Sequence, residues 1–344
     1  MEKRRLSAAE ICLVALLAAF VLFVLVWSMV FDKTEKTRSR EFYNYFDTVT
    51  FVSDYSGGTD ADFEAACRLT EESLEYYHEL FDIYNEYEGL TNIATLNRLA
   101  GGGPVEVTEE LFDFLEYSLG MYELTEGEVN IAMGAVLRLW HSARESGVTV
   151  PDGEELRAAY MHCNIDSVVL NRAKLTVEIT DPLLSLDVGA VAKGYTAEKI
   201  AEMLVTEGIS SYVLDLGGNI RAIGTKPDGS GWSTGVRNPD KGSAEAYVYR
   251  FELVDGSAVT SGDYERYYIL DGVKYHHIID KDTLYPAAHF TSVTVITEHS
   301  GLADTLSTAL FCMDYESGTA LLDTLDGVSA VFVTSDGRVL EYNK

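Results

Sequence analysis

The segment LDVGAVAKGYTAEKIAEM, residues 186–203, decides the fold around it. An apolar strand end leads through Asp187 and Gly189 into a helix. Apolar side chains then recur at i, i+3, i+4 and i+7, namely Ala197, Ile200, Ala201 and Leu204. A helix N-terminus has free N–H groups and partial positive charge, so it binds anions, and Lys193 adds a full charge in the first turn. A glycine-rich helix start also serves packing alone, so the segment leaves both interpretations open.

The chain is long and strongly acidic. It has 344 residues, 47% of them apolar, which is enough for one large domain or two ordinary ones. The formal net charge is −29, yet residues 1–40 hold seven Lys/Arg against four Asp/Glu, so the remainder carries −32. Such a body repels nucleic acid phosphates, which argues against DNA or RNA as a partner. An anionic ligand would need a divalent cation or local basic residues to bind.

Residues 11–31 form an apolar run without a charged side chain. At about 1.5 Å per residue the run spans a hydrocarbon core of about 30 Å, whereas a cleaved signal peptide usually has a shorter apolar part. We therefore expect residues 1–31 to be a cytoplasmic tail and a transmembrane anchor. Residues 32–41 are expected to be a charged linker, and residues 42–344 the functional domain.

Basic residues flank the apolar run on both sides, so the charge bias does not set its orientation. A short N-terminal tail commonly stays inside. We therefore expect a single-pass protein of the cell membrane with its domain on the extracytoplasmic side.

The four cysteines form no CxxC pair and no cluster with histidine at zinc spacing. They are Cys12, Cys67, Cys163 and Cys312. Buried free thiols are therefore expected.

The rest of the chain alternates blocks of helix with strands that pair locally. Periodicity and capping residues predict helices over 60–87, 92–99, 108–124 and 302–313, and a turn feeding a helix over 127–140. Strands are predicted over 47–53, 212–216 and 292–297, and strand pairs over 166–180, over 267–280 with a turn at Asp271-Gly272, and around Asp336-Gly337. This arrangement indicates an α+β fold with antiparallel sheet.

The helix that begins near Ala303 carries a second pattern. Asp304 and Thr308 lie one turn apart, on the face opposite the apolar stripe. A carboxylate and a hydroxyl at this spacing can both reach one hard cation such as Mg²⁺. The alternative is a solvated polar face. Phe311 falls on the same face, where water does not favour it, so a partly buried polar site remains an equal alternative.

Two adjacent histidines, His276 and His277, lie on the predicted hairpin, just before Ile278. Neighbouring strand residues point to opposite faces, so one histidine at most lines a given pocket. That histidine would be a general base near neutral pH, while the alternative is a structural residue with its hydrogen bonds satisfied.

Together these blocks resemble the ApbE family of flavin transferases, which move FMN from FAD onto a serine or threonine of a target protein and release AMP. The resemblance covers residues 45–325 and implies a T-fold-type arrangement of antiparallel sheets with helices packed against them. It rests on blocks in the family's order: Asp187 to Tyr195, Leu216-Gly217-Gly218-Asn219, Ser261-Gly262-Asp263-Tyr264, His277-Ile278-Ile279-Asp280, and Ser292 to Val295 followed by Ala303 to Ala309.

The resemblance implies a metal and two catalytic residues. The backbone carbonyl of Ala190 would join Asp304 and Thr308 as Mg²⁺ ligands. Lys193 would hold the phosphates, and His277 would take the proton from the attacking hydroxyl.

The resemblance also implies how FAD is bound. Asp187 and Lys193 would contact it, Ser307 and Ile278 would line the flavin site, and Tyr84 would pack on the flavin ring. A loop would complete the contacts, made of Glu128, Val129 and Asn130. The chain departs from the family pattern at this loop, where Phe-Asp is common, at Phe46-Asp47-Thr48, where Met-Gly-Thr is common, and after Asp280, where the family commonly has an Asp-Pro…Thr-Gly-x-Pro loop.

The implied reaction is a Mg²⁺-dependent phosphoryl transfer that depends on positioning and charge neutralisation. FAD would be the FMN donor, and the anchor suggests an acceptor at the same membrane, such as a redox subunit. Two alternatives remain. One is an FAD pyrophosphatase that yields FMN and AMP, and the other is a non-enzymatic, membrane-tethered flavin-binding module.

Overall fold

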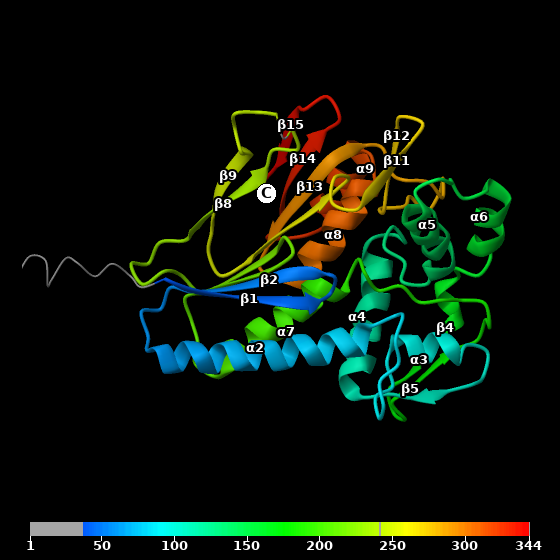
Figure 1. Cartoon of the computed structure of the whole chain (residues 1–344), viewed down its shortest axis with the longest axis horizontal. Coiled ribbons are helices and arrows are strands. Elements are labelled where there is room, and N and C mark those ends of the chain that lie inside the picture. Colours follow the sequence, from blue (N-terminus) through cyan, green and yellow to red (C-terminus); the bar gives the residue numbers. More distant parts are fainter. Residues whose placement is uncertain (1–36, 241, 344) are drawn as a thin grey trace, which may run out of the picture.

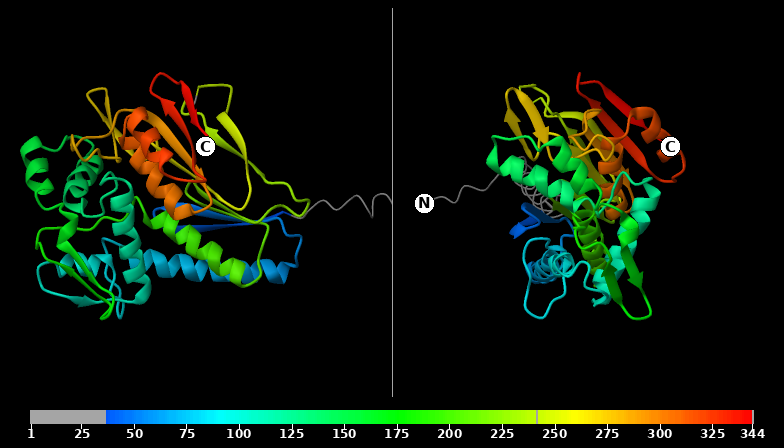
Figure 2. Two further views of the ribbon diagram at one scale, coloured as in Figure 1. Left: turned by 180° about the vertical axis from the view of Figure 1, so that it is seen from behind. Right: turned by 90° about the vertical axis from the view of Figure 1, so that its right-hand side faces the viewer.

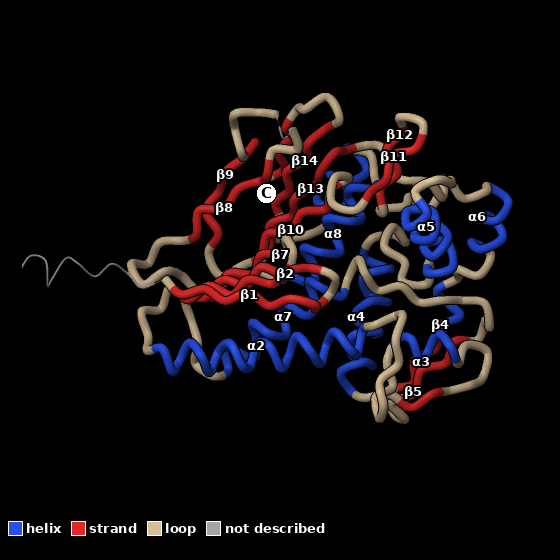
Figure 3. Tube along the Cα trace, in the orientation of Figure 1, coloured by secondary structure: helices blue, strands red, loops and turns tan. Residues whose placement is uncertain are grey.

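The computed structural model describes residues 37–240 and 242–343, and its centre is an antiparallel sheet of eight strands. Each strand of this sheet pairs antiparallel with its neighbours. In spatial order the strands are β1 (Arg38–Tyr45), β2 (Thr48–Asp54), β6 (Tyr212–Leu216), β7 (Asn219–Ile223), β10 (Ser257–Gly262), β13 (Phe290–Thr297), β14 (Ser329–Thr334) and β15 (Val339–Tyr342). Figure 1 and Figure 3 show this sheet running through the molecule.

Three smaller sheets complete the strands. They are β3 (Val105–Glu106), β5 (Thr176–Ile179) and β4 (Val168–Asn171) in one sheet, β8 (Trp232–Arg237) with β9 (Tyr247–Leu253), and β11 (Tyr267–Leu270) with β12 (Val273–His276). All pairings in these sheets are antiparallel too. The α+β fold with antiparallel sheets, predicted from the sequence, is thus confirmed.

Helices α7 (Ala192–Thr206) and α8 (Ser300–Cys312) pack against each other and against the central strands of the large sheet. Helix α2 (Asp60–Phe81) lies on α7 and runs along the lower edge of the molecule toward α4 and α3 in the view of Figure 1, and Figure 2 shows it from behind. A helical lobe at one end contains α3 (Ile93–Arg98), α4 (Glu109–Leu124), α5 (Gly134–Ser146) and α6 (Gly153–Tyr160). A last helix, α9 (Tyr315–Asp323), follows α8.

Two apolar cores hold α7 and α8 in place. Ile200 and Leu204 of α7 pack with Leu214 of β6 and with buried residues of α2. Leu306 and Leu310 of α8 pack with valines of β13 and with β14. Fully burying a side chain of this size stabilises a fold by roughly 1.5–3 kcal/mol. The two helices that carry the predicted site residues are therefore fixed by the core.

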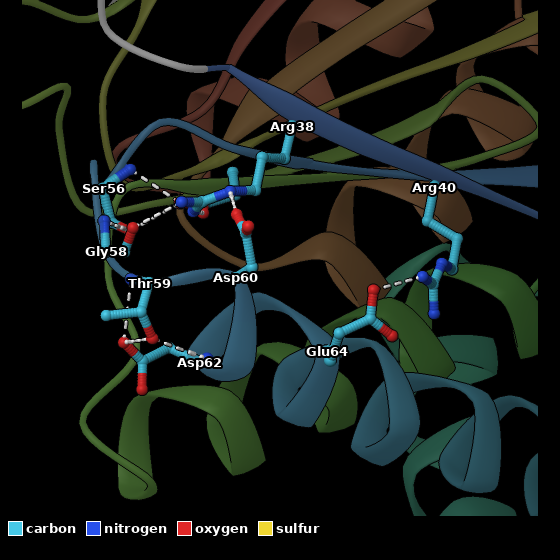
Figure 4. Close-up of polar contacts among 9 residues, drawn as sticks. Arg38, Arg40, Ser56, Gly58, Thr59, Asp60, Asp62 and Glu64 are labelled. Atoms are coloured by element: carbon cyan, nitrogen blue, oxygen red, sulfur yellow. Dashed lines mark hydrogen bonds and ion pairs between the residues drawn. The ribbon is translucent and has the colours of Figure 1, made fainter.

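The start of the described chain differs from the linker predicted over 32–41, because β1 already begins at Arg38. The Arg38 guanidinium donates to Asp54 at 2.7 Å and to Asp60 at 2.9 Å, and Arg40 donates to Glu64 at 2.6 Å. Figure 4 shows these arginines reaching down to the start of α2. Arginines that look like linker charges in the sequence instead join an edge strand to the next helix.

Helix α2 also ends earlier than predicted, at Phe81 rather than near residue 87. The Asp82 carboxylate accepts hydrogen bonds from the backbone N–H of Tyr84 at 2.7 Å and of Asn85 at 3.1 Å. A side chain that bonds to the backbone in this way competes with the helix. Its other oxygen accepts from the Tyr87 hydroxyl at 2.9 Å. Tyr84 therefore lies in a loop beyond the helix.

The predicted membrane anchor, residues 11–31, lies outside the described residues. Within residues 37–240 and 242–343, no helix has the length and apolar character needed to cross a bilayer. Three of the predicted free thiols, Cys67, Cys163 and Cys312, are free and buried, as expected.

Candidate active site

The predicted site is built where α7 and α8 touch. Gly194, in the first turn of α7, donates its backbone N–H to Oδ2 of Asp304 on α8 at 2.7 Å. A Cβ at position 194 would lie 2.5 Å from the carbonyl oxygen of Ser300 and would overlap Asp304. Only glycine allows this approach. Asp304 thereby bonds an N–H of the helix N-terminus that has no partner within α7.

Asp304 is buried, with 3% of its surface exposed, and its charge is only partly compensated. Burial raises the pKa of its carboxyl group, while Lys193, the Gly194 N–H and the Asn219 amide act to lower that pKa. The nearest cation is the Lys193 ammonium, 3.9 Å from Oδ2. Lys193 Nζ also donates to the carbonyl of Gly189 at 3.4 Å. A buried carboxylate with one cation at this distance attracts a further positive charge.

Three hydroxyls continue the site along α8. Ser261 Oγ at the end of β10 lies 2.9 Å from Ser307 Oγ and 3.2 Å from Thr308 Oγ1. Ser307 is fully buried and also donates to the carbonyl of Asp304 at 2.9 Å, and Phe311 on the same face is fully buried. The solvated polar face, one of the two alternatives that the sequence left open, is thus excluded.

The two histidines have different partners and different tautomers. His276 donates from Nε2 to the carbonyl of Ala287 at 2.8 Å and accepts at Nδ1 from the backbone N–H of Ile278 at 3.3 Å. His277 Nδ1 lies 3.2 Å from the carbonyl of Arg266, which only accepts hydrogen bonds, so Nδ1 carries the proton. Its Nε2 is then a free base. His276 is satisfied on both sides and structural.

His277 is neutral in this environment. Burial, together with the positive charges of Arg266 and Lys193, lowers its pKa to about 3. Among the charges that lower this pKa is that of Lys193, the other residue implied in catalysis. The structure thus relates the two residues that the sequence assigned to catalysis.

Asp187 and Tyr84 lie together beside a group of basic side chains. Gly189 N–H donates to the Asp187 carboxylate at 3.0 Å, and the backbone N–H of Asp187 donates to Ile131 at 2.8 Å. Burial raises the pKa of Asp187, while His141, Arg266 and Arg144 act to lower it. Tyr84 is 63% exposed, and its ring centre lies 5.7 Å from that of His141. Sequence reasoning did not identify this basic group.

The side chains of residues 128–130 contact residues other than Asp304. Glu128 forms an ion pair with Lys281 at 3.2 Å. Val129 is buried, and the Asn130 amide donates to Cys163 O at 2.9 Å while its oxygen accepts from Ala132 N–H at 2.9 Å. The residue after this loop, Ile131, links it to the site, because the Ile131 carbonyl accepts from the Asp187 N–H. The structure does not join these three side chains to the α7–α8 contact.

Ile278 also sits differently from a pocket residue. Its side chain is buried in the core cluster that includes Val293 and Leu306. Its backbone N–H bonds to His276, and its carbonyl accepts from Ala287 at 3.0 Å. Any contribution of Ile278 to the site would therefore come from holding its neighbour His277 in place.

The proposed metal ligands fit a hard cation by their donor type. The carboxylate of Asp304, the hydroxyl of Thr308 and the backbone of Ala190, in the turn before α7, are the donor types that Mg²⁺ prefers. Among the residues that the structure describes, no group of three or more His, Cys, Asp or Glu is placed to hold a metal. A cation here would therefore need water or ligand phosphates to complete its coordination.

Comparison with known proteins extends these observations. The model of the ApbE family matches residues 48–332. The chain is 38% identical over 261 residues to an FAD:protein FMN transferase of Treponema pallidum, with 72% of each chain covered. It is 30% identical to an FAD:protein FMN transferase of Klebsiella pneumoniae, covering 76% of this chain and 83% of that protein.

Solved structures show the same fold. A crystal structure of the ApbE protein of Thermotoga maritima matches with a TM-score of 0.80 and 26% identity, covering 90% of this chain and 97% of that one. The flavin transferase ApbE of Vibrio cholerae matches with a TM-score of 0.76 and 26% identity, covering 89% and 97%. The similarity spans both helices of the candidate site.

Proposed function

The chain belongs to the ApbE family, and we infer on that premise that it is an FAD:protein FMN transferase. It transfers FMN from FAD to a serine or threonine hydroxyl of an acceptor protein and releases AMP. The observation that carries the assignment to this site is the buried Asp304, bonded to the α7 N-terminus and 3.9 Å from Lys193.

We propose that Mg²⁺ is required and that the Ala190 carbonyl, Asp304 and Thr308 hold it. Support comes from the incompletely compensated carboxylate and the all-oxygen donor set. When bound, Mg²⁺ would neutralise negative charge on the pyrophosphate of FAD. Lys193 and the N-terminus of α7 would bind the same phosphates, so an acidic protein accommodates an anionic substrate locally.

The acceptor hydroxyl would attack the phosphorus on the FMN side of the pyrophosphate. A new phosphorus–oxygen bond then forms, the bond to the AMP phosphate breaks, and the hydroxyl proton moves to Nε2 of His277. The Arg266 carbonyl holds His277 in the tautomer that leaves Nε2 free. A pyrophosphate beside Lys193 would raise the low pKa of His277, which makes it a better base with substrate bound.

For the flavin we propose that Tyr84 packs on the ring, since its side chain is exposed and next to Asp187. We propose that Asp187 contacts FAD. Ser307 and Ile278 are both buried, so they would support the flavin site from behind, Ser307 through its contact with Ser261 and Ile278 through its position next to His277. The loop of Glu128, Val129 and Asn130 contributes mainly through its backbone and Glu128, because Val129 is buried and the Asn130 side chain is already bonded.

Residues 11–31 are proposed as a membrane anchor, with the catalytic domain on the extracytoplasmic side. The acceptor is then proposed to be a membrane-associated redox subunit. The apolar run in the sequence supports both proposals.

The test mixes the full-length protein in detergent with FAD, Mg²⁺ and a purified candidate acceptor domain, followed by the intact mass of the acceptor. A mass gain of one FMN that is lost with EDTA and with Asp304→Ala supports the function and the metal site. Asp314→Ala, at the exposed N-cap of α9, is the matched control and should keep the activity. AMP release without a mass gain would indicate a pyrophosphatase, and intact FAD would indicate a binding module.

A further inference from the structure

The side-chain amide of Asn219 is buried without a hydrogen-bond partner. The residue is 2% exposed, and in the described part of the chain its Nδ2 contacts no acceptor with hydrogen-bond geometry. A buried donor left unpaired destabilises a folded protein, so such a group calls for an explanation.

The turn before Asn219 fixes its place. Gly217 and Gly218 both have positive φ, 62° and 96°, and a Cβ at Gly217 would overlap the Thr48 side chain. The Asp215 carboxylate accepts from the backbone N–H of Gly218 at 2.7 Å. Asn219 then begins β7 and pairs with Leu216 and Val259. Its side chain is therefore presented from a rigid turn.

The charged group beside Asn219 is the Asp304 carboxylate. The Asn219 amide acts to lower the pKa of Asp304 without reaching hydrogen-bond geometry, and that carboxylate already accepts from Gly194 N–H and lies 3.9 Å from the Lys193 ammonium. Besides the Gly194 N–H, which Asp304 already bonds, the Lys193 ammonium and the unpaired Asn219 amide thus lie beside this carboxylate. Such a set of donors favours an oxyanion as the missing acceptor.

We propose that Asn219 is a substrate-binding residue whose Nδ2 donates a hydrogen bond to a pyrophosphate oxygen of FAD. The proposal rests on the proposed function and adds a residue to its site. It gives the unpaired amide its acceptor only when substrate is bound. The Asn219 side chain therefore contributes to FAD affinity and little to the stability of the free protein.

Asn92 provides a contrast within the same chain. It is also an asparagine with no exposed surface, but its Nδ2 donates to the carbonyls of Glu79 at 2.9 Å and Asn85 at 2.8 Å. Its oxygen accepts from the backbone N–H of Thr95 at 3.0 Å and caps α3. Asn92 is fully bonded without any ligand, so it serves as the structural control.

The experiment measures binding of FAD, ADP and riboflavin to the full-length protein in detergent with Mg²⁺, together with its melting temperature. Asn219→Ala should weaken FAD and ADP binding by roughly tenfold or more, because a hydrogen bond to a charged group is lost. Riboflavin binding and the melting temperature of the free protein should stay close to wild type. Asn219→Thr keeps a hydrogen-bond donor and suits a strand, so its affinity for FAD and ADP should lie between those of wild type and Asn219→Ala.

Asn92→Ala should show the opposite pattern, with a lower melting temperature and an unchanged ratio of FAD to riboflavin affinity. The proposal is overturned if Asn219→Ala keeps FAD affinity within twofold, which means that a water satisfies the amide. It is also overturned if the variant melts early and loses FAD and riboflavin affinity equally. Failure of the proposed function is separate: wild-type protein would then bind FAD without transferring FMN.

Discussion

Helices α7 and α8 each carry a carboxylate that bonds the N-terminus of the other helix. Glu198 is half-buried and Asp304 is buried, and the two carboxylates differ in their partners. Glu198 of α7 accepts from the backbone N–H of Ser300 at 2.6 Å and from Arg221 at 3.2 and 3.3 Å. Asp304 of α8 accepts from Gly194 N–H, and its nearest cation is 3.9 Å away. The paired carboxylate completes the fold, whereas the incompletely paired one remains available for a ligand.

The largest effect is expected for Asp304→Asn, which tests whether Asp304 differs in role from Glu198. We expect FMN transfer to fall by about 1000-fold, roughly 4 kcal/mol in the barrier, because the proposed metal loses its carboxylate. The free protein should become more stable, since an incompletely compensated buried charge is removed. Intact mass of the acceptor and thermal unfolding measure the two effects. A large loss of stability would place Asp304 with Glu198 as a structural group.

Glu198→Ala should act mainly on stability. Removing Glu198 from this partly buried ion pair leaves Arg221 with Asp255 alone, and we expect a loss of about 2 kcal/mol in unfolding free energy. FAD affinity of the folded protein should change little. Urea unfolding followed by tryptophan fluorescence checks the first expectation, and FAD titration checks the second. An unchanged urea midpoint would contradict the assignment of Glu198 to the fold.

His277 extends the comparison to a titratable group whose surroundings keep it neutral. Its pKa of about 3 lies below the value near 6.5 of an unfolded histidine. Between these values the unfolded chain binds more protons, so this contribution to stability is complete above pH 6.5 and is lost as pH falls through that window. Wild type should therefore lose more melting temperature from pH 7 to pH 5 than His277→Asn.

The control for the pH series is His289→Asn, because His289 is exposed. Its melting temperature should follow that of wild type between pH 7 and pH 5. Parallel curves for wild type and His277→Asn would show that His277 is not held neutral by its surroundings.

Tyr84→Ala should have the smallest effect. The side chain is 63% exposed, so the stability of the free protein should not change measurably. If the ring packs on the flavin, losing it should weaken flavin binding by roughly fivefold, about 1 kcal/mol. Titration with riboflavin measures this, and Tyr43→Ala, at an exposed tyrosine in β1, is the control. Equal affinities for all three proteins would remove Tyr84 from the flavin site.

Local signals in the sequence predicted many elements correctly. Thr108 caps α4 through the backbone N–H of Leu111, as its position before two glutamates indicated. Asp271 and Gly272 have the positive φ values of a two-residue hairpin turn between β11 and β12. Each feature depends on residues a few positions apart, so the sequence alone was sufficient. The family resemblance was confirmed by the comparisons, while the residue roles remain predictions.

Features that depend on distant partners could not be predicted. β1 needs Asp54 and Glu64 to pair its arginines, and α2 ends where the Asp82 side chain turns back on the backbone. Asn219 and Ser261 stood in motifs that the sequence analysis quoted, yet their significance depends on residues 46 to 85 positions away. The unpaired state of the Asn219 amide is a property of the folded protein alone.

Helix α2 sets the distance between the start of the described chain, near Arg38, and the proposed flavin residue Tyr84. Its first residue, Asp60, holds Arg38 where the described chain begins, and Tyr84 follows its last turn (Figure 1, Figure 4). With 22 residues, α2 is about 33 Å long. If residues 11–31 tether the protein to a bilayer, this helix acts as a spacer arm. Acceptor hydroxyls that stand well clear of the lipid surface would then be reached more readily than those at the headgroups.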